Sequence, residues 1–234
     1  MKKIIAITLL MLIGFNASAN DNAKRITELF IKDDVSTFRK GGGSVIGKKI
    51  PSVNASQLIS EYANNQFKYE KKYDNTVVYI KTVASGVKTD FSGDPYVVAN
   101  GKNQFEHVSL ELKNKDDAMN INKGNKLELI CVGTKNNVMF PSLKKCVTAD
   151  SYFQKFIETT MLNINKLDKD AKPDNSFEAF YFGLWEFDVK KPNILDKYKT
   201  VSELIKNKSD FDEILDFAES KATDEVKNFT MPKP

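Results

Sequence analysis

The chain has 234 residues, with 35 Lys and Arg, 31 Asp and Glu, one His and a formal net charge of +4. This length is enough for one or two domains with a hydrophobic core. The near balance of charge excludes the strongly basic footprint of a domain whose affinity comes from neutralising phosphates.

The N-terminus has the pattern of an export signal. Lys2 and Lys3 precede an apolar run at 4–15, and small residues follow at 17–19. We predict a signal peptide cleaved after Ala19 and a periplasmic or secreted chain that begins at Asn20. No Cys lies directly after the cleavage site to carry a lipid, and no later segment is long enough to span a bilayer. Without Lys2 and Lys3 the chain keeps 33 basic residues against 31 acidic ones, a net charge of +2.

Residues 20–54 are predicted to form an N-terminal helix and a Gly-rich linker. The helix covers 22–34, with one apolar face that includes Ile26 and Phe30. Residues 42–48 match the phosphate-loop pattern G-x-x-x-x-G-K, but Lys49 stands where Ser or Thr would hold magnesium, and no apolar strand precedes the pattern. A flexible linker is therefore the favoured interpretation.

The central stretch reads as short strands. Alternating or β-branched runs lie at 76–83, 96–99, 108–112, 127–132 and about 138–147, and a helical turn is predicted at 116–121. A helix capped by Asn54 leads into them. Three strands, a short helix and two strands are the order of a five-stranded OB-type β-barrel.

Four features of the central stretch stand out: the pairing of 131–133 with 141–146, the Asp-Pro-Tyr-Val of 94–97, the Lys-Gly turn at 123–124 and the lead-in helix at 58–62. In these features residues 55–150 resemble exported bacterial OB-fold proteins of the tRNA_anti-like family. The resemblance implies a fold of nucleic-acid-binding ancestry. Thr82 departs from the pattern, since a small residue is expected where the first strand curls; Gly86 could supply the curvature.

Cys131 and Cys146 are the two cysteines of the chain. In an oxidising compartment an even count predicts a disulfide. A zinc site would need further ligands, and a nucleophilic Cys would need His107 and an oxyanion hole that the sequence does not identify. A tight turn at 136–137 would leave Cys146 too far from Cys131. We therefore expect a longer connection, or a β-bulge near Pro141.

Residues 151–234 are predicted to be all-helical, with four helices. Their expected starts are Ser151 with Gln154, Asn175 with Glu178, Thr200 with Glu203, and Ser209. Phe177, Phe180, Tyr181, Leu184 and Trp185 form a stripe at helical spacing that is either a core or a partner-binding face, and the core is favoured.

The expected fold class is thus α+β: an OB-type barrel at 55–150 with flanking N-terminal helices and a C-terminal all-helical region at 151–234. No catalytic motif accompanies His107, so we predict no enzymatic activity, metal or cofactor. The favoured function is an exported binding protein for an envelope or extracellular protein, peptide or saccharide. The alternatives are single-strand nucleic-acid binding, which the small charge disfavours, and an enzyme with an unrecognised site. The candidate ligand face consists of Tyr79, Lys81, Lys88, Phe91, Tyr96, Lys102 and Phe105.

Overall fold

The computed structural model describes residues 2–103, 105–135 and 139–234, with side chains from Asn20 onward. The chain forms two compact units. We call residues 41–155 with 231–234 the sheet unit, and residues up to 40 with 156–230 the helical unit. Helix α4 (Ala149–Ile164) runs from the first into the second.

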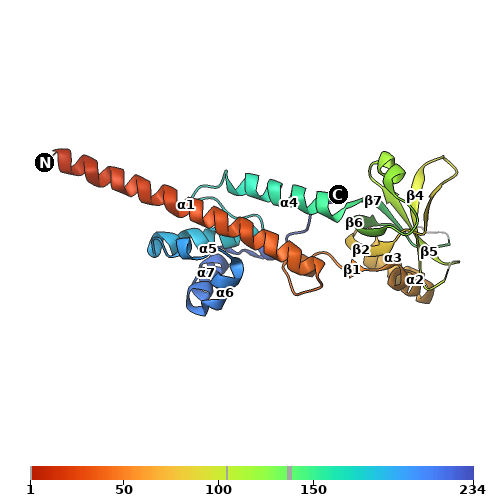
Figure 1. Cartoon of the computed structure of the whole chain (residues 1–234). Helices are drawn as coiled ribbons and strands as arrows, with labels where there is room; N and C mark the ends of the chain where they lie inside the picture. The colour runs from red at the N-terminus through yellow and green to blue at the C-terminus, as the bar shows by residue number, and fades with distance from the viewer. Residues whose placement is uncertain (1, 104, 136–138) are drawn as a thin grey trace. The chain divides into compact units, whose positions relative to one another are not determined.

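The sheet unit contains one sheet with the strand order β1-β2-β6-β7-β5-β4-β3 (Figure 1). β1 pairs with β2 and β5 pairs with β7 in parallel, and the other neighbours are antiparallel. The strands are β1 (Ser52–Val53), β2 (Val77–Val83), β3 (Gly86–Thr89), β4 (Pro95–Asn100), β5 (His107–Leu112), β6 (Lys126–Gly133) and β7 (Ser142–Thr148).

The α+β class is as predicted, but the predicted number of strands, five, is wrong, because the sheet has seven. The five predicted strands correspond to β2, β4, β5, β6 and β7. The sheet has two more, β1 and β3, and they form its two ends, so the ladder is open rather than closed. β1 has two residues and β3 four, too few for a periodic pattern to reveal. The fifth predicted strand begins later than expected, at Ser142, and the Asn136–Asn137 turn lies outside the described residues.

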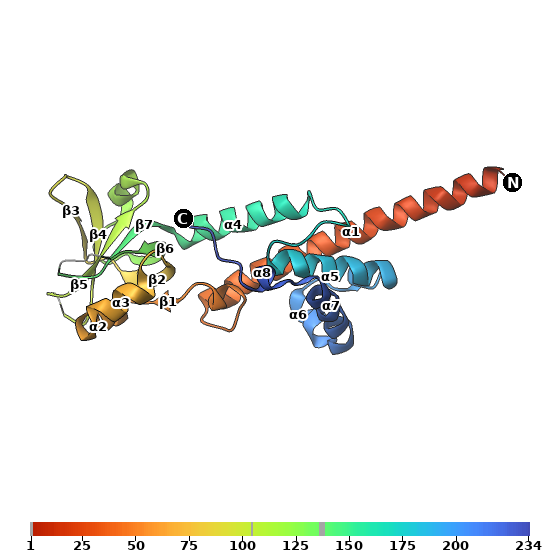
Figure 2. The same cartoon turned by 180° about the vertical axis from the view of Figure 1, so that it is seen from behind.

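Helices α2 (Ala55–Asn64) and α3 (Gln66–Tyr73) lie against the sheet (Figure 2). The side chain of Asn54 accepts a hydrogen bond from the Gln57 amide at 2.9 Å, so the predicted cap is confirmed. Apolar residues of both helices share one core with the inner face of the sheet. Its members include Leu58, Ile59, Tyr69, Tyr73, Val78, Ile80, Val97, Leu110, Leu129 and Leu143.

The Gly-rich segment precedes β1. It contains a 3-10 turn, η1 (Ile46–Lys48), and Ile46 and Ile50 are completely buried. The Ser44 hydroxyl accepts a hydrogen bond from the Gly47 amide at 2.8 Å. These contacts give the segment a defined path that the linker interpretation did not anticipate.

A β-bulge brings the two cysteines together. Ile130 pairs with Val147 and Val132 with Lys144, so Lys145 and Cys146 both lie opposite Cys131. Lys145 has a positive φ of 54°, the left-handed conformation that lets the chain bulge. Cys131 and Cys146 form a disulfide between β6 and β7. Gly133 pairs with Leu143, so the connection is longer than a tight turn, as expected, and a bulge is also present, at Lys145 and not at Pro141.

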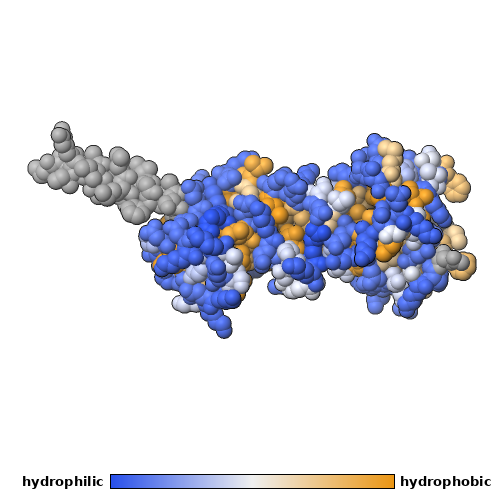
Figure 3. All heavy atoms as spheres, viewed as in Figure 1, coloured by the Kyte–Doolittle hydropathy of each residue, from blue (hydrophilic) through white to orange (hydrophobic). Residues whose placement is uncertain are grey.

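The helical unit combines the described part of α1 with the C-terminal helices. The helices are α1 (Lys2–Arg39), α5 (Ser176–Lys190), α6 (Val201–Lys206), α7 (Lys208–Lys221) and α8 (Asp224–Lys227), with the 3-10 turn η3 (Leu195–Lys197). Phe177, Tyr181 and Leu184 are completely buried, which confirms the core interpretation of the aromatic stripe. On the face seen in Figure 3, hydrophilic residues predominate on both units.

Helix caps in this unit follow the sequence in part. The side chains of Asn175 and Thr200 cap α5 and α6 as predicted, with Glu203 completing a capping box. Ser209 is not a cap, because the side chain of Asn207 accepts the hydrogen bond at the start of α7. The helix predicted to begin at Ser151 starts earlier, and the Ser151 amide donates to the hydroxyl of Thr148.

Residues 20–26 belong to the core of the helical unit. Ala23 and Ile26 are buried among Phe180, Leu184 and Ile214. Arg25 donates hydrogen bonds to the carbonyls of Leu195 and Tyr198 at 3.0 and 2.9 Å, and the hydroxyl of Tyr181 donates to the side chain of Asn20 at 2.5 Å. The first helix of the expected mature chain is therefore structural.

Candidate functional site

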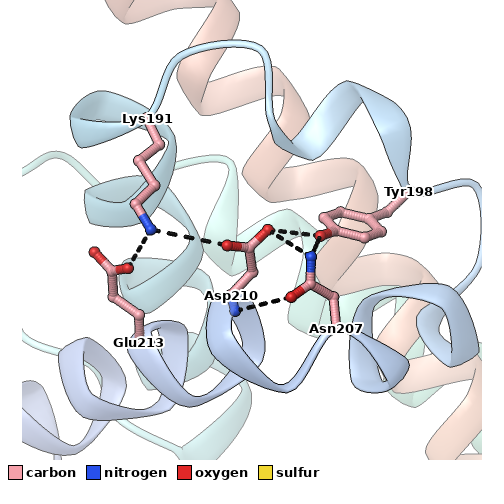
Figure 4. Close-up of polar contacts among 5 residues, drawn as sticks. All are labelled: Lys191, Tyr198, Asn207, Asp210 and Glu213. Carbon is pink, nitrogen blue, oxygen red and sulfur yellow. Dashed lines mark hydrogen bonds and ion pairs between the residues drawn. The ribbon is translucent and has the colours of Figure 1, made fainter.

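A cluster of polar side chains and a cleft are the two candidate sites. The first, in the helical unit, links Lys191, Tyr198, Asn207, Asp210 and Glu213 (Figure 4). Asp210 accepts from the hydroxyl of Tyr198 at 2.6 Å and from the amide of Asn207 at 3.1 Å, while Lys191 donates to Glu213 at 2.5 Å.

These groups satisfy one another, and they join the end of α5 to the corner between α6 and α7. Burial, and then the hydrogen bond to Asp210, raises the pKa of Tyr198 to about 12. The hydroxyl therefore stays protonated at neutral pH and keeps donating to Asp210. We assign this cluster a structural role.

The second candidate is a cleft of about 780 Å³ in the sheet unit. Its volume falls in the range of ~300–1,000 Å³ that is common for ligand sites. The lining residues, which define the cleft below, are Thr89, Asp90, Phe91, Asp94, Pro95, Tyr96, Ser109, Glu111, Leu112, Lys115, Thr134, Lys135, Phe140, Ser142 and Lys144.

Strand register builds the floor of the cleft. Tyr96 of β4 lies opposite Glu111 of β5, and Ser109 of β5 lies opposite Ser142 of β7. Since side chains alternate along a strand, Ser109 and Glu111 face the cleft while Leu110 faces the core. The disulfide fastens β7 to β6, and the parallel ladder between β5 and β7 places Ser142 and Lys144 so that they complete the floor.

One wall of the cleft is the turn between β3 and β4. The carboxylate of Asp90 accepts hydrogen bonds from the amides of Ser92 and Asp94 at 2.8 and 2.9 Å. This Asx turn leaves the side chain of Phe91 fully exposed at its tip. Lys115, at the start of η2 (Lys115–Asn120), donates to Asp94 at 2.5 Å and fixes the turn from the other side.

The opposite wall consists of Thr134, Lys135 and Phe140, which lie between β6 and β7. The hydroxyls of Thr134 and Ser142 lie 2.7 Å apart. The ring of Phe140 packs on that of His107, with the ring centroids 4.4 Å apart. Burial, and then the Lys88 ammonium, lowers the pKa of His107, so this ring is neutral at pH 7.

The charges in the cleft cancel. Three acidic residues and three lysines line it. Asp94 is paired with Lys115, whereas the carboxylate of Glu111 and the ammonium of Lys144 have no hydrogen bond or ion pair to another described residue. The free polar groups of the floor are thus one anion and one cation, together with the hydroxyls of Tyr96 and Ser109.

The structure brings together three of the seven residues of the predicted ligand face. Phe91 and Tyr96 line the cleft. Lys88, on β3, lies opposite Tyr96 of β4. Lys102 and Phe105 are exposed on the connection between β4 and β5, and neither lines the cleft.

Tyr79 and Lys81 do not line the cleft. Tyr79 is completely buried, and its hydroxyl donates to Glu128 at 2.5 Å. The ammonium of Lys81 lies 3.5 Å from the same carboxylate. The expectation that Tyr79 is available for stacking is therefore wrong.

Sequence reasoning missed Ser109, Glu111, Lys115, Ser142 and Lys144. The alternation Val108-Ser109-Leu110-Glu111-Leu112 carried a signal for the first two, since they are the outward positions of a strand with an apolar inner face. Ser142 and Lys144 of β7 lie on either side of the buried Leu143, but this alternation spans only three residues before the bulge at Lys145 interrupts it.

Two kinds of feature are absent from the described residues. No three His, Cys, Asp or Glu side chains are grouped so that they could hold a metal ion. Over the same part of the chain, no helix has the length and apolar character needed to cross a bilayer.

Comparison with known proteins gives one family. The family model tRNA_anti-like matches residues 2–147. No curated protein matches the sequence. Among solved structures, a candidate nucleic acid-binding lipoprotein from Klebsiella pneumoniae subsp. pneumoniae aligns with 14% identity and a TM-score of 0.35, over 42% of this chain and 91% of that chain.

Proposed function

The chain belongs to the tRNA_anti-like family, and on that premise we propose that the sheet unit is an OB-type module in which β2 and β3 are two halves of one bent strand. Only Ala84 and Ser85 separate them. The Ala84 amide donates to the Asn125 carbonyl beside β6, and the Ser85 amide donates to Val98 of β4. Counting β2 and β3 as one strand, with β1 as an addition at the edge, gives the five strands of that fold.

The proposed function is to bind a ligand in the cleft, without catalysis. The observation that carries it is the position of the cleft. OB folds bind ligands on the face of their second and third strands, between the loops that follow the first and fourth strands. In this chain those parts are β4, β5 and the connections after β3 and β6, and residues from all four line the cleft.

The surroundings of His107 support a binding role rather than a catalytic one. A general base acts on a nucleophile within hydrogen-bond reach. The ring of His107 instead packs on Phe140 and has no hydrogen bond to a described residue.

Export is the second part of the proposal. It is supported by the signal pattern at 1–19 and by the disulfide, since disulfides form in oxidising compartments. We expect the exported chain to begin at Asn20. Intact-mass analysis of protein recovered from outside the cytoplasm checks this, and a mass that retains residues 1–19 would contradict it.

Replacing Tyr96 tests the binding proposal. Purified mature protein is titrated calorimetrically with neutral oligosaccharides, an extended neutral peptide and a mixed-sequence single-stranded oligonucleotide. Tyr96→Ala should weaken the probe that binds by about tenfold, the usual consequence of losing a stacked aromatic ring. Phe67→Ala is the matched control, because Phe67 is 71% exposed on α3 and does not line the cleft. If both substitutions weaken the affinity for the probe equally, or if neither weakens it, the cleft is not the binding site.

A further inference from the structure

The free polar groups of the floor have complementary hydrogen-bonding roles. The hydroxyls of Tyr96 and Ser109 can donate and accept, the carboxylate of Glu111 accepts, and the ammonium of Lys144 donates. None of the four has a side-chain hydrogen bond or ion pair to another described residue. A ligand rich in hydroxyl groups, each both donor and acceptor, matches this set.

Aromatic rings lie beside these polar groups. Tyr96 is part of the floor, and Phe91 and Phe140 stand on the two walls. The rings offer flat apolar surfaces, and Tyr96 also carries a polar tip. A pyranose ring has a matching construction, with an apolar face of C–H groups and a rim of hydroxyls.

The charges disfavour a polyanionic ligand. Nucleic-acid affinity rises with the number of phosphates that lysines neutralise. In the cleft three carboxylates offset three lysines, and Glu111 stands unpaired in the floor. A phosphate chain across β4 and β5 would lie against this carboxylate, and the repulsion would offset the attraction of Lys144.

The backbone of the floor disfavours an extended peptide. β4 pairs with β3 and β5, β5 pairs with β4 and β7, and β7 pairs with β5 and β6. Each strand of the floor therefore uses its backbone groups on both sides, and the cleft presents side chains rather than a free edge. Strand addition, which needs a free edge, cannot occur there.

We propose that the ligand of the cleft is a short neutral oligosaccharide, an inference that rests on the proposed function of the cleft. Tyr96 stacks on one sugar ring, while Ser109, Glu111 and Lys144 hydrogen-bond its hydroxyls. The volume of about 780 Å³ holds a short oligomer.

The test exploits the opposite effects of Glu111 on the two ligand classes. An array of neutral oligosaccharides selects the best sugar, and its affinity is compared with that of a mixed-sequence single-stranded oligonucleotide for wild type and Glu111→Gln. This nearly isosteric change removes the charge and replaces one acceptor oxygen by an amide donor. The sugar should bind about tenfold more weakly, because a charge-assisted hydrogen bond is lost. Any oligonucleotide binding should become stronger, because a repulsion is removed.

Tyr96→Ala should also weaken the sugar, and high salt should leave its affinity nearly unchanged. The inference is overturned if no neutral oligosaccharide binds, or if Glu111→Gln leaves sugar affinity unchanged. If the oligonucleotide or the peptide binds instead and Tyr96→Ala weakens it, the cleft remains a binding site but its ligand is not a sugar. If Tyr96→Ala weakens no probe, the proposed function fails as well.

Discussion

Replacing Cys131 and Cys146 together by alanine should lower the free energy of unfolding of the sheet unit by about 3 kcal/mol, the chain-entropy value for a loop of roughly 15 residues. The two cysteines are 15 residues apart, and both are buried in the core. For a chain of this size the melting temperature should fall by roughly 6–12 °C. Circular dichroism during heating under non-reducing conditions measures it.

Reductant supplies the control for this substitution. Adding it to wild type should bring the melting temperature close to that of the double variant, and adding it to the variant should change nothing. Since β7 carries Ser142 and Lys144, the variant should also bind its ligand more weakly near the transition. A melting temperature within about a degree of wild type would show that the bond contributes nothing to stability.

Gly183→Ala should destabilise the helical unit by about 3 kcal/mol, the upper part of the range for overpacking a core. A Cβ atom at this position of α5 would lie 2.4 Å from the carbonyl oxygen of Ile214 and 3.0 Å from the Cβ of Ala218, both on α7. The helices would have to move apart, because backbone atoms cannot yield as a flexible side chain does. The chain has one Trp, at 185 on α5, so its fluorescence during urea unfolding reports on this unit.

Gly43→Ala is the matched control for that substitution. Its added Cβ meets no atom within 4 Å, and its backbone does not have a positive φ. The control should unfold at the urea concentration of wild type. Equal unfolding midpoints for Gly183→Ala and wild type would mean that α5 and α7 do not pack as closely as described.

The periodicity of apolar residues predicted those helices and strands in which apolar residues recur at regular spacing. The long strands and the aromatic helix were found because their apolar residues recur at fixed spacing. β1, β3 and α3 were not, since the first two are very short and α3 is polar along most of its length. The bulge depends on Lys145 adopting a positive φ, a conformation that a lysine does not indicate in a sequence as glycine or asparagine does.

The cleft was predictable only where neighbours in sequence are neighbours in space. Phe91 and Tyr96 belong to one hairpin, which turn residues reveal. Ser109 and Ser142 meet because β5 and β7 pair in parallel, although β6 lies between them in the sequence. Local patterns do not determine such a pairing. Tyr79 was placed on the ligand face by alternation, yet both sides of β2 are covered at that point.

The packing partner of α1 could not be predicted from the sequence for a similar reason. Its apolar face with Ala23 and Ile26 was evident, but a hydrophobic stripe does not specify its partner. The structure packs it on α5, far along the chain.

The central claim, that the cleft is the ligand-binding surface, is tested most directly by amide NMR of the mature, disulfide-bonded protein titrated with the best neutral oligosaccharide. The amides that shift should belong to β4, β5, β7 and the connections after β3 and β6, with Tyr96, Ser109 and Glu111 among them. The amides around Phe67 should stay in place. Shifts that cluster in the helical unit, or on α2 and α3, while the residues of the cleft remain unchanged would contradict the claim.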